Sequence, residues 1–246
     1  MISKNQVKFI RQLEQKKFRR REGLFVAEGT KVVGDLMARY QPKALYATKE
    51  WLMTHPTPGA EEITDEELRR LSFQQHPQQV LALFPLPANP VLKPIEGLAL
   101  ALDGVQDPGN LGTIIRIADW FGISTIICSE DTVDAWNPKV VQATMGSLAR
   151  VNIIYYSMTT LLDALPKDFP VYGTFLDGDN IYTQELSKEG LIIMGNEGNG
   201  ISDAVRCRVN RRLLIPDFHH GQTADSLNVA IATAITCSEF RRRYSL

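Results

Sequence analysis

Apolar positions along the first third of the chain recur at spacings that alternate between helix and strand. Helical spacing gives one apolar side to each helix, and short apolar runs bounded by polar or glycine residues are typical of strands. Thr64, followed three residues later by Glu67, has the spacing of a capping box before a short helix. The predicted helices cover 4–17, 30–40 and 66–71, and the predicted strands cover 23–29, 43–48 and 79–84.

Beyond residue 97 the same alternation continues with longer apolar runs. Runs this apolar predict strands buried on both faces, and helices between them predict a mostly parallel sheet covered on both sides. The predicted strands are 98–105, 125–129, 151–156, 171–176, 190–195 and 212–216, and the predicted helices are 110–121, 138–149 and one starting at about Ser226.

Four prolines between residues 85 and 94 separate these two parts. Proline fixes its own φ and restricts the residue before it, so the stretch is expected to be extended. We therefore predict a small α/β domain over 1–88, a proline-rich linker over 89–97 and a larger α/β domain over 98–246.

Composition narrows the class of protein further. The 246 residues include no apolar run long enough to cross a membrane, and the charged N-terminus lacks the apolar core of a signal peptide. Three widely spaced cysteines favour a reducing compartment, which predicts a cytoplasmic protein. Adjacent histidines at 219 and 220, with no cysteine nearby, do not have the spacing of a metal site, so we predict none.

The formal net charge of −1 hides a basic N-terminus. Residues 1–31 contain nine Lys or Arg and three Glu, whereas the other 215 residues contain 18 basic and 25 acidic ones. Such an arm predicts either a polyanionic partner or simply a solvated helix face. The candidates for contact with such a polyanion are Lys16, Lys17, Arg19, Arg20 and Arg21.

Three segments of the second part carry candidate chemistry, and each follows a predicted strand. In residues 103–122 a Pro-Gly-Asn-Leu-Gly turn opens a helix that bears Arg116 among apolar neighbours. In 191–202 a Gly-Asn-Glu-Gly-Asn-Gly loop lacks the spacing of a dinucleotide fingerprint. In 213–235 a polar loop leads into Ser-Leu-Asn at the start of the last helix, where Ser226 could be a plain N-cap. Taken singly, each is also explained as an ordinary turn.

Together and in this order, the three segments resemble the SpoU/TrmH branch of the SPOUT RNA methyltransferases. The resemblance covers about residues 98–240, and the first part resembles, less specifically, the ribosomal-protein-like substrate-binding domain that often precedes that domain. The matching residues are Asn110-Leu111-Gly112 with Arg116, Gly195-Asn196-Glu197-Gly198, and Ile215-Pro216 followed by Ser226-Leu227-Asn228-Val229.

The resemblance implies a parallel sheet with a deep trefoil knot, a homodimer, and S-adenosylmethionine as the methyl donor for an RNA 2′-hydroxyl. It implies that ribosomal RNA is the substrate in preference to transfer RNA. One departure is a loop over 217–225 that is about three residues longer than the family pattern. The implied catalytic residues are Asn110, Arg116, Glu197, Ser226 and Asn228, and the implied cofactor-binding residues are Gly195, Asn196, Gly198, Ile215 and Leu227.

The chemistry of its guanidinium group limits the role that Arg116 can have in the reaction. A guanidinium is effectively always protonated in proteins, so Arg116 is a poor general base. We therefore expect it to hold the phosphate next to the target ribose and to stabilise the developing alkoxide, while the proton passes to phosphate, water or Glu197. Two other classes remain open: an RNA-binding protein without catalysis, and a nucleotide-dependent Rossmann enzyme, against which the glycine spacing argues.

Overall fold

The computed structural model describes residues 1–219 and 225–244, and these form two compact units. The first consists of Met1–Ala88 together with Asp134–Ala149, and the second of Asn89–Val133 together with Arg150–Leu246. The predicted division differs at two segments. Residues 89–97, predicted as a linker, belong to the second unit, where Leu92 and Ile95 pack against its core. Residues 134–149 pack with the first unit although both their neighbours along the chain belong to the second.

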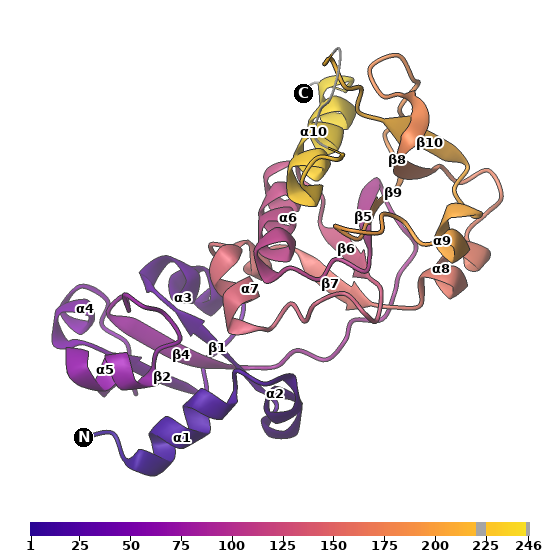
Figure 1. Ribbon diagram of the computed structural model, residues 1–246. Helices are drawn as coiled ribbons and strands as arrows, with labels where there is room; N and C mark the ends of the chain where they lie inside the picture. The colour runs from indigo at the N-terminus through magenta and orange to yellow at the C-terminus, as the bar shows by residue number, and fades with distance from the viewer. Residues whose placement is uncertain (220–224, 245–246) are drawn as a thin grey trace. The chain divides into compact units, whose positions relative to one another are not determined.

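The first unit is built on a four-stranded sheet in the order β1-β4-β2-β3 (Figure 1). Strand β4 runs antiparallel to both β1 and β2, and the two-residue β3 runs parallel to β2. Its strands are β1 Leu24–Glu28, β2 Ala44–Ala47, β3 Glu61–Glu62 and β4 Val80–Pro85. Its helices are α1 Lys4–Gln12, α2 Lys16–Glu22, α3 Thr30–Met37, α4 Lys49–Thr54, α5 Asp65–Leu71, α7 Pro138–Ala143 and the 3₁₀ turn η1 Ser147–Ala149.

Several helix boundaries of the first unit differ from those predicted. The capping box at Thr64 and Glu67 is confirmed at the start of α5. The single helix predicted over 4–17 is wrong, because the chain breaks after Leu13 and restarts at Lys16 as α2. The helix predicted over 138–149 is also interrupted, since Gly146 takes φ +94° directly against Asp35, where a Cβ would lie 2.2 Å from a carboxylate oxygen.

A buried arginine explains why residues 134–149 belong to the first unit. Arg19 is 1% exposed and forms an ion pair with Asp134, and it also donates to the carbonyl oxygens of Leu13 and Glu14 at 2.8 and 2.6 Å. The ring of Trp136 lies 4.8 Å from that of Phe25 on β1. The segment thus completes the core of the first unit and neutralises a charge inside it.

The second unit contains a six-stranded sheet in the order β10-β8-β9-β5-β6-β7, in which every neighbouring pair is parallel, so the predicted parallel sheet is confirmed. Its strands are β5 Leu98–Asp103, β6 Thr125–Cys128, β7 Asn152–Tyr155, β8 Val171–Asn180, β9 Gly190–Gly195 and β10 Arg211–Leu214. Its helices are α6 Pro108–Trp120, α8 Met158–Ala164, α9 Asp203–Arg206 and α10 Val229–Arg242.

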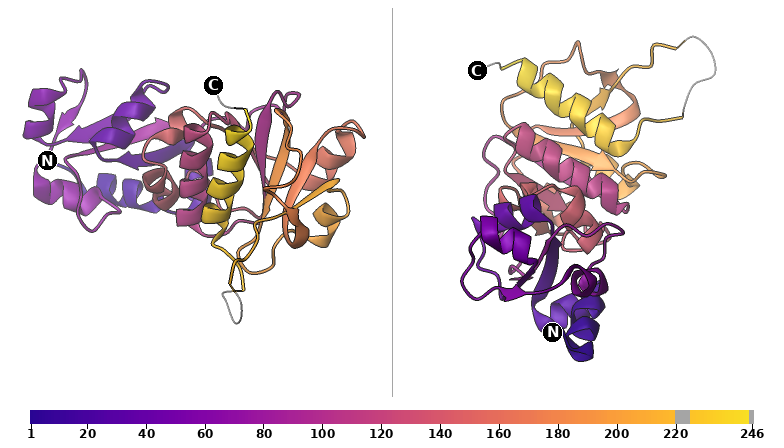
Figure 2. Two further views of the ribbon diagram at one scale, coloured as in Figure 1. Left: turned by 90° about the horizontal axis from the view of Figure 1, so that it is seen from above. Right: turned by 90° about the vertical axis from the view of Figure 1, so that its left-hand side faces the viewer.

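Helices cover both faces of this sheet (Figures 1 and 2). On one face α6 and α10 pack side by side, and Arg241 at the end of α10 donates to the carbonyl oxygens of Phe121 and Gly122 beyond α6. On the other face α8 and α9 pack on the alternate residues Ala99 and Ala101 of β5. The central strands β5 and β9 are buried along their whole length, so their carboxyl ends are firmly placed.

Candidate active site

The carboxyl ends of β5 and β9 lie next to each other, and the two loops that follow them form the base of the site. Asp103 is paired in register with Gly195, and its carboxylate accepts the backbone N–H of Ser202 at 2.7 Å. A Cβ on Gly195 would lie 2.2 Å from the carbonyl carbon of Gly200. Only glycine therefore fits at the end of β9, because the loop folds back on the strand at this point.

Asn196 fixes the shape of the loop after β9. Its side-chain amide donates to the carbonyl oxygen of Gly104 at 2.7 Å, which ties this loop to the one after β5. Its side-chain oxygen accepts the N–H groups of Gly198 and Asn199 at 2.9 and 3.0 Å. Asn196 thus organises the backbone, and its own polar atoms are already engaged.

Glu197 joins this loop to the start of α6. Its carboxylate accepts the backbone N–H groups of Gln106 and Asp107 at 3.2 and 3.1 Å, and the side-chain amide of Asn110 at 3.0 Å. Asp107 is the N-cap of α6 and accepts the N–H of Asn110 at 2.8 Å. The first turn of α6 is therefore held from two sides by carboxylates.

The third segment enters through Asn228. Its side-chain amide donates to the side-chain oxygen of Asn110 at 2.9 Å, and its own oxygen caps α10 by accepting the N–H groups of Ala230 and Ile231. Asn228, not Ser226, is therefore the N-cap, and α10 begins at Val229. Glu197, Asn110 and Asn228 form one hydrogen-bonded chain that connects all three segments.

The hydrogen bonds to Glu197 determine its protonation. Partial burial alone would raise the pKa of this carboxyl, but the bonds from Asn110 and from the backbone N–H groups outweigh burial and leave the pKa below its ordinary value. Glu197 is thus ionised at neutral pH, and its oxygens are occupied by donors. It is suited to holding Asn110 in place and is a weak proton acceptor.

Arg116 and Ser226 lie outside this chain of hydrogen bonds. Arg116 is exposed on α6, six residues beyond Asn110 and therefore about 9 Å farther along the helix axis. Within residues 1–219 and 225–244, neither its guanidinium nor the exposed hydroxyl of Ser226 has a hydrogen bond or ion pair. Both side chains are therefore available to a ligand, and Arg116 offers an unneutralised positive charge.

The residues expected to bind a cofactor lie at the end of β9 and in the loop after it, just after β10, and before α10. Gly195 is buried, Gly198 is exposed, Ile215 after β10 is half-buried and Leu227 is 50% exposed. No heavy atom lies within 4 Å of a Cβ built at Gly200, so the loop backbone is open on that side. An open glycine backbone of this kind lets a ligand approach closely. Residues 220–224 of the loop after Pro216, including the second histidine of the pair, lie outside the described residues.

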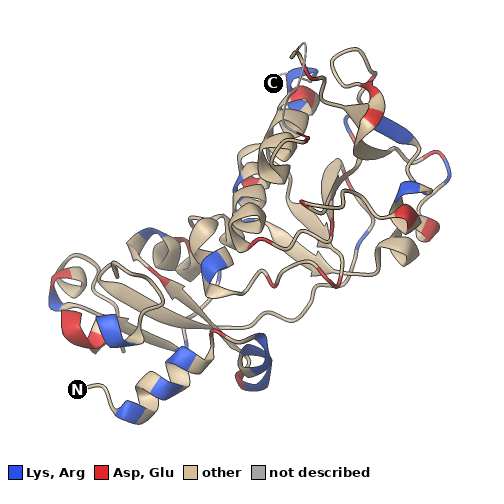
Figure 3. Ribbon diagram, viewed as in Figure 1, with Lys and Arg blue, Asp and Glu red and all other residues tan. Residues whose placement is uncertain are grey.

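The basic residues predicted to contact RNA divide into two groups. Lys16, Lys17, Arg20 and Arg21 are exposed on the short helix α2, which is mostly basic (Figure 3). Arg19 is not available, because it is buried in the ion pair with Asp134. The prediction is corrected at this position: a helix repeats every 3.6 residues, so one of several consecutive arginines must face the core.

Sequence reasoning missed the acidic residues that organise the site, Asp103 and Asp107. The signal for Asp107 was present, since an N-cap residue followed by proline at the first helical position is a common start of a helix. Asp103 had no such signal, because its partner Ser202 lies 99 residues away. Among the described residues, no three His, Cys, Asp or Glu side chains gather as metal ligands would, and no helix is long and apolar enough to cross a membrane.

Two protein families match this chain. Residues 97–238 match the SpoU rRNA Methylase family, and residues 4–82 match the MRM3-like substrate binding domain. The first match includes every residue of the Glu197, Asn110 and Asn228 chain, and it covers more than half of the protein.

Individual relatives cover nearly the whole length. The chain is 31% identical over 251 residues to the Bacillus subtilis protein named 23S rRNA (guanosine(2553)-2′-O)-methyltransferase RlmP, with 97% of each chain covered. A structure from Porphyromonas gingivalis, described as a putative RNA methyltransferase of the TrmH family, is 44% identical with a TM-score of 0.90 over 99% of each chain. An AdoMet-bound rRNA methyltransferase from Sinorhizobium meliloti is 32% identical with a TM-score of 0.86, covering 100% of this chain and 98% of that one.

Proposed function

The chain belongs to the SpoU rRNA methylase family, and from that premise we propose that it transfers a methyl group from S-adenosylmethionine to a ribose 2′-hydroxyl of ribosomal RNA. The observation that carries the proposal is the hydrogen-bonded chain of Glu197, Asn110 and Asn228. It joins the three matching segments, and Arg116, which has no partner among the described residues, lies about 9 Å farther along α6.

The loops around the hydrogen-bonded chain of Glu197, Asn110 and Asn228 fit the methyl donor. Gly195, Gly198 and the half-buried Ile215 would hold it through the backbone, and the exposed Leu227 would cover its apolar part. When bound, S-adenosylmethionine supplies a methyl group on a positively charged sulfur. Asn196 and Glu197 keep the loop after β9 in shape, so that this part of the site needs no ligand to order it.

Arg116 is the residue we assign to the reacting ribose. Its planar guanidinium can hold the neighbouring phosphate through two parallel hydrogen bonds and stabilise negative charge as the 2′-oxygen loses its proton. The lowered pKa of Glu197 and the donors on both of its oxygens argue against that residue as the proton acceptor. The proton is therefore assigned to the phosphate or to water, with Asn110 and Asn228 as positioning residues.

Arg116→Lys tests this assignment. Lysine keeps the charge but cannot form the bidentate contact, so we expect a loss of most activity with an unchanged pH dependence. Arg211→Lys, which changes an exposed arginine on β10, is the control and should retain activity. Near-normal activity of Arg116→Lys with a strongly acid-shifted pH profile would support a general-base role and contradict the clamp.

The RNA itself is identified by mapping 2′-O-methylation in a strain that lacks this protein. We expect one ribosomal RNA position to lose its methyl group and to regain it when the gene is restored, but not when the Arg116→Lys variant is supplied. Loss of a methyl group at a transfer RNA position instead would make transfer RNA the substrate of the same methyl-transfer reaction. Unchanged methylation of both RNA classes would favour a binding protein of the same fold.

The exposed cations of α2 are proposed to contact phosphates of this RNA. Such contacts give affinity that falls as salt rises. Changing Lys16, Lys17, Arg20 and Arg21 together to alanine should weaken RNA binding and flatten its salt dependence, while affinity for S-adenosylmethionine stays the same. Arg19 is left intact because its removal would leave Asp134 without its partner. Equal RNA affinity with and without the four cations would contradict the assignment.

Three further features are proposed from family membership. A homodimer is supported by exposed apolar side chains on the adjacent helices α6 and α10, notably Trp120 at 85% and Ile231 at 52% exposure. Trp120→Glu should then increase the monomer fraction in light scattering.

A trefoil knot is supported by the return of the chain from the edge strand β10 to α10 beside α6. A cytoplasmic location is supported by three cysteines that are all free.

A further inference from the structure

The segment that joins α5 to β4 in the first unit has an unusual composition. Residues 74–79, here called the amide loop, read Gln-Gln-His-Pro-Gln-Gln and contain no Asp, Glu, Lys or Arg. Loops on protein surfaces are commonly charged, and this one instead presents side chains that each donate and accept hydrogen bonds. The methyl-transfer chemistry of the second unit makes no use of it.

The start of the amide loop is anchored by a buried carboxylate. Glu28, at the end of β1, is 5% exposed and accepts the backbone N–H of Phe73 at 2.8 Å and the hydroxyl of Ser72. Arg11 donates to the carbonyl oxygen of Ser72, and its guanidinium lies 4.8 Å from the centre of the Phe73 ring. Burying a carboxylate is costly unless it is hydrogen-bonded, so this anchor fixes the backbone where the loop begins.

The end of the amide loop is held in a strained conformation. Gln79 has φ +41°, which is uncommon for a residue other than glycine. Its carbonyl oxygen accepts the N–H of Thr48 at 2.8 Å, and the N–H of Gly29 donates to the next carbonyl, that of Val80, at 2.9 Å. Strained residues of this kind persist where the surrounding structure determines them and are found preferentially at binding sites.

Between these anchors, three polar side chains point to solvent. Gln75, His76 and Gln78 are exposed, whereas Gln74 donates to the side-chain oxygen of Gln142 in α7 at 2.9 Å. Gln75 and His76 have no hydrogen bond to any residue that the structure describes. Gly29 provides space for Gln78, since a Cβ there would lie 2.9 Å from the Gln78 side-chain oxygen. The loop therefore presents solvent-exposed donors and acceptors on a backbone that is held at both ends.

We propose that the amide loop reads the bases of unpaired nucleotides in the RNA substrate. The proposal rests on the proposed function, which supplies the RNA. Side-chain amides match the paired donor and acceptor atoms of base edges, and sequence-specific recognition of RNA is directed mainly at unpaired bases. The lack of positive charge in the loop argues against a role in holding phosphate, and the lack of negative charge means that it does not repel a polyanion.

The amide loop and helix α2 have separate tasks in this scheme. Helix α2 precedes β1, and the loop packs where β1 ends, so the five residues of β1 place them about 17 Å apart. Charges on α2 contribute affinity without reading sequence, whereas contacts from the loop discriminate between RNAs. Loss of the α2 charges should therefore lower the affinity for any RNA, whereas loss of the loop contacts should lower the preference for one RNA over another.

The test compares two RNAs at several salt concentrations. The probes are ribosomal RNA from a strain lacking this protein and bulk transfer RNA, and the variant is Gln75→Ala with His76→Ala. We expect the preference for ribosomal RNA to fall by about tenfold or more, as for the loss of one good base contact, with the salt dependence unchanged. Gln41→Ala, an exposed glutamine before β2 at the other end of the sheet, should change neither.

The outcomes separate the inference from the function on which it rests. The inference is overturned if the variant with Gln75→Ala and His76→Ala retains its preference for ribosomal RNA. The same result is expected if the loop binds a protein instead of RNA. An equal loss of affinity for both RNAs with a flatter salt dependence also overturns it, because that is the signature of a phosphate contact. A wild-type protein that methylates neither RNA would contradict the proposed function directly, before any variant is compared. Unchanged affinity for S-adenosylmethionine shows that the second unit of the variants is folded.

Discussion

Replacing Asp134 by alanine is expected to destabilise the first unit strongly. The side chain of Arg19 is 2% exposed and that of Asp134 is 13% exposed, so their ion pair is largely shielded from water. Without the carboxylate, the guanidinium keeps only the carbonyl oxygens of Leu13 and Glu14 as partners. Removing one partner of a buried pair leaves an uncompensated charge, which typically costs about 3–5 kcal/mol. That is a large part of the stability of a small domain.

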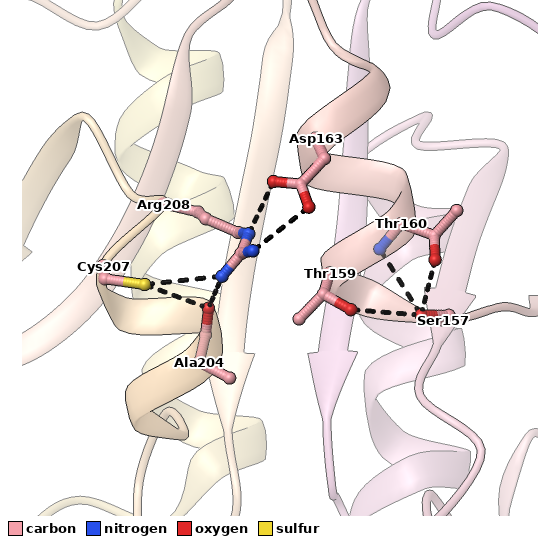
Figure 4. A network of polar contacts seen from close by, with 7 residues as sticks. All are labelled: Ser157, Thr159, Thr160, Asp163, Ala204, Cys207 and Arg208. Carbon is pink, nitrogen blue, oxygen red and sulfur yellow. Dashed lines mark hydrogen bonds and ion pairs between the residues drawn. The ribbon is translucent and has the colours of Figure 1, made fainter.

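Urea unfolding followed by tryptophan fluorescence measures this effect. Trp51 and Trp136 belong to the first unit and report its unfolding, whereas Trp120 belongs to the second and is already exposed. Asp163→Ala is the matched control, because Asp163 forms an ion pair with Arg208 at 2.7 Å on the surface of the second unit (Figure 4). Exposed pairs contribute little, so the control should leave the unfolding midpoint nearly unchanged.

A second variant separates charge burial from a general loss of packing. Arg19→Met combined with Asp134→Leu removes both charges and keeps apolar volume, and it should regain most of the stability that Asp134→Ala loses. An Asp134→Ala protein whose first transition lies within about 1 kcal/mol of wild type would refute the reasoning. So would a double variant that is no more stable than Asp134→Ala.

Three other tests concern the site and the core. Gly195→Ala should lower the melting temperature and the affinity for S-adenosylmethionine, because its Cβ would lie 2.2 Å from backbone, whereas Gly198→Ala, with 3.7 Å of room, should fold normally. Glu197→Gln should slow methyl transfer without changing its pH dependence between about pH 6 and pH 9; a lost titration step there would make Glu197 the base. Burial raises the pKa of Glu28 above 4.5 despite its hydrogen bonds to Ser72 and Phe73. The protonated carboxyl therefore stabilises the folded protein below pH 4.5, and this contribution is lost as pH rises through the raised pKa. Glu28→Gln should remove that dependence in urea unfolding measured from pH 4 to pH 8, and parallel curves for the two proteins would contradict it.

The elements of the fold were largely predictable because each depends on local patterns. The buried strands β5 and β9 appear as continuous apolar runs, and the capping box of α5 as a fixed spacing. Helix ends were less predictable where a distant contact decides them. The break between α1 and α2 is stabilised by Arg19, whose partner Asp134 lies 115 residues away.

The residues of the hydrogen-bonded chain were predictable as candidates, but which of the candidates bond to one another was not. The sequence placed Asn110 and Glu197 in turns that follow strands and Asn228 at the start of the last helix, on segments that a parallel sheet can bring together. It did not distinguish them from Arg116 and Ser226, which stand outside the hydrogen-bonded chain. That distinction depends on the hydrogen bond from Asn110 to Glu197, 87 residues away, and on the one from Asn228 to Asn110, 118 residues away. No local pattern encodes either bond.

The docking of residues 134–149 on the first unit has a consequence for engineering this protein. The polypeptide passes between the two units at residues 88–89, 133–134 and 149–150, so the first unit is discontinuous in the gene. A fragment ending at residue 88 would contain a buried Arg19 without Asp134 and an exposed Phe25 without Trp136. A chimera that exchanges substrate specificity between relatives would therefore have to transplant two separate stretches, and the shorter one is encoded between two strands of the methyltransferase sheet.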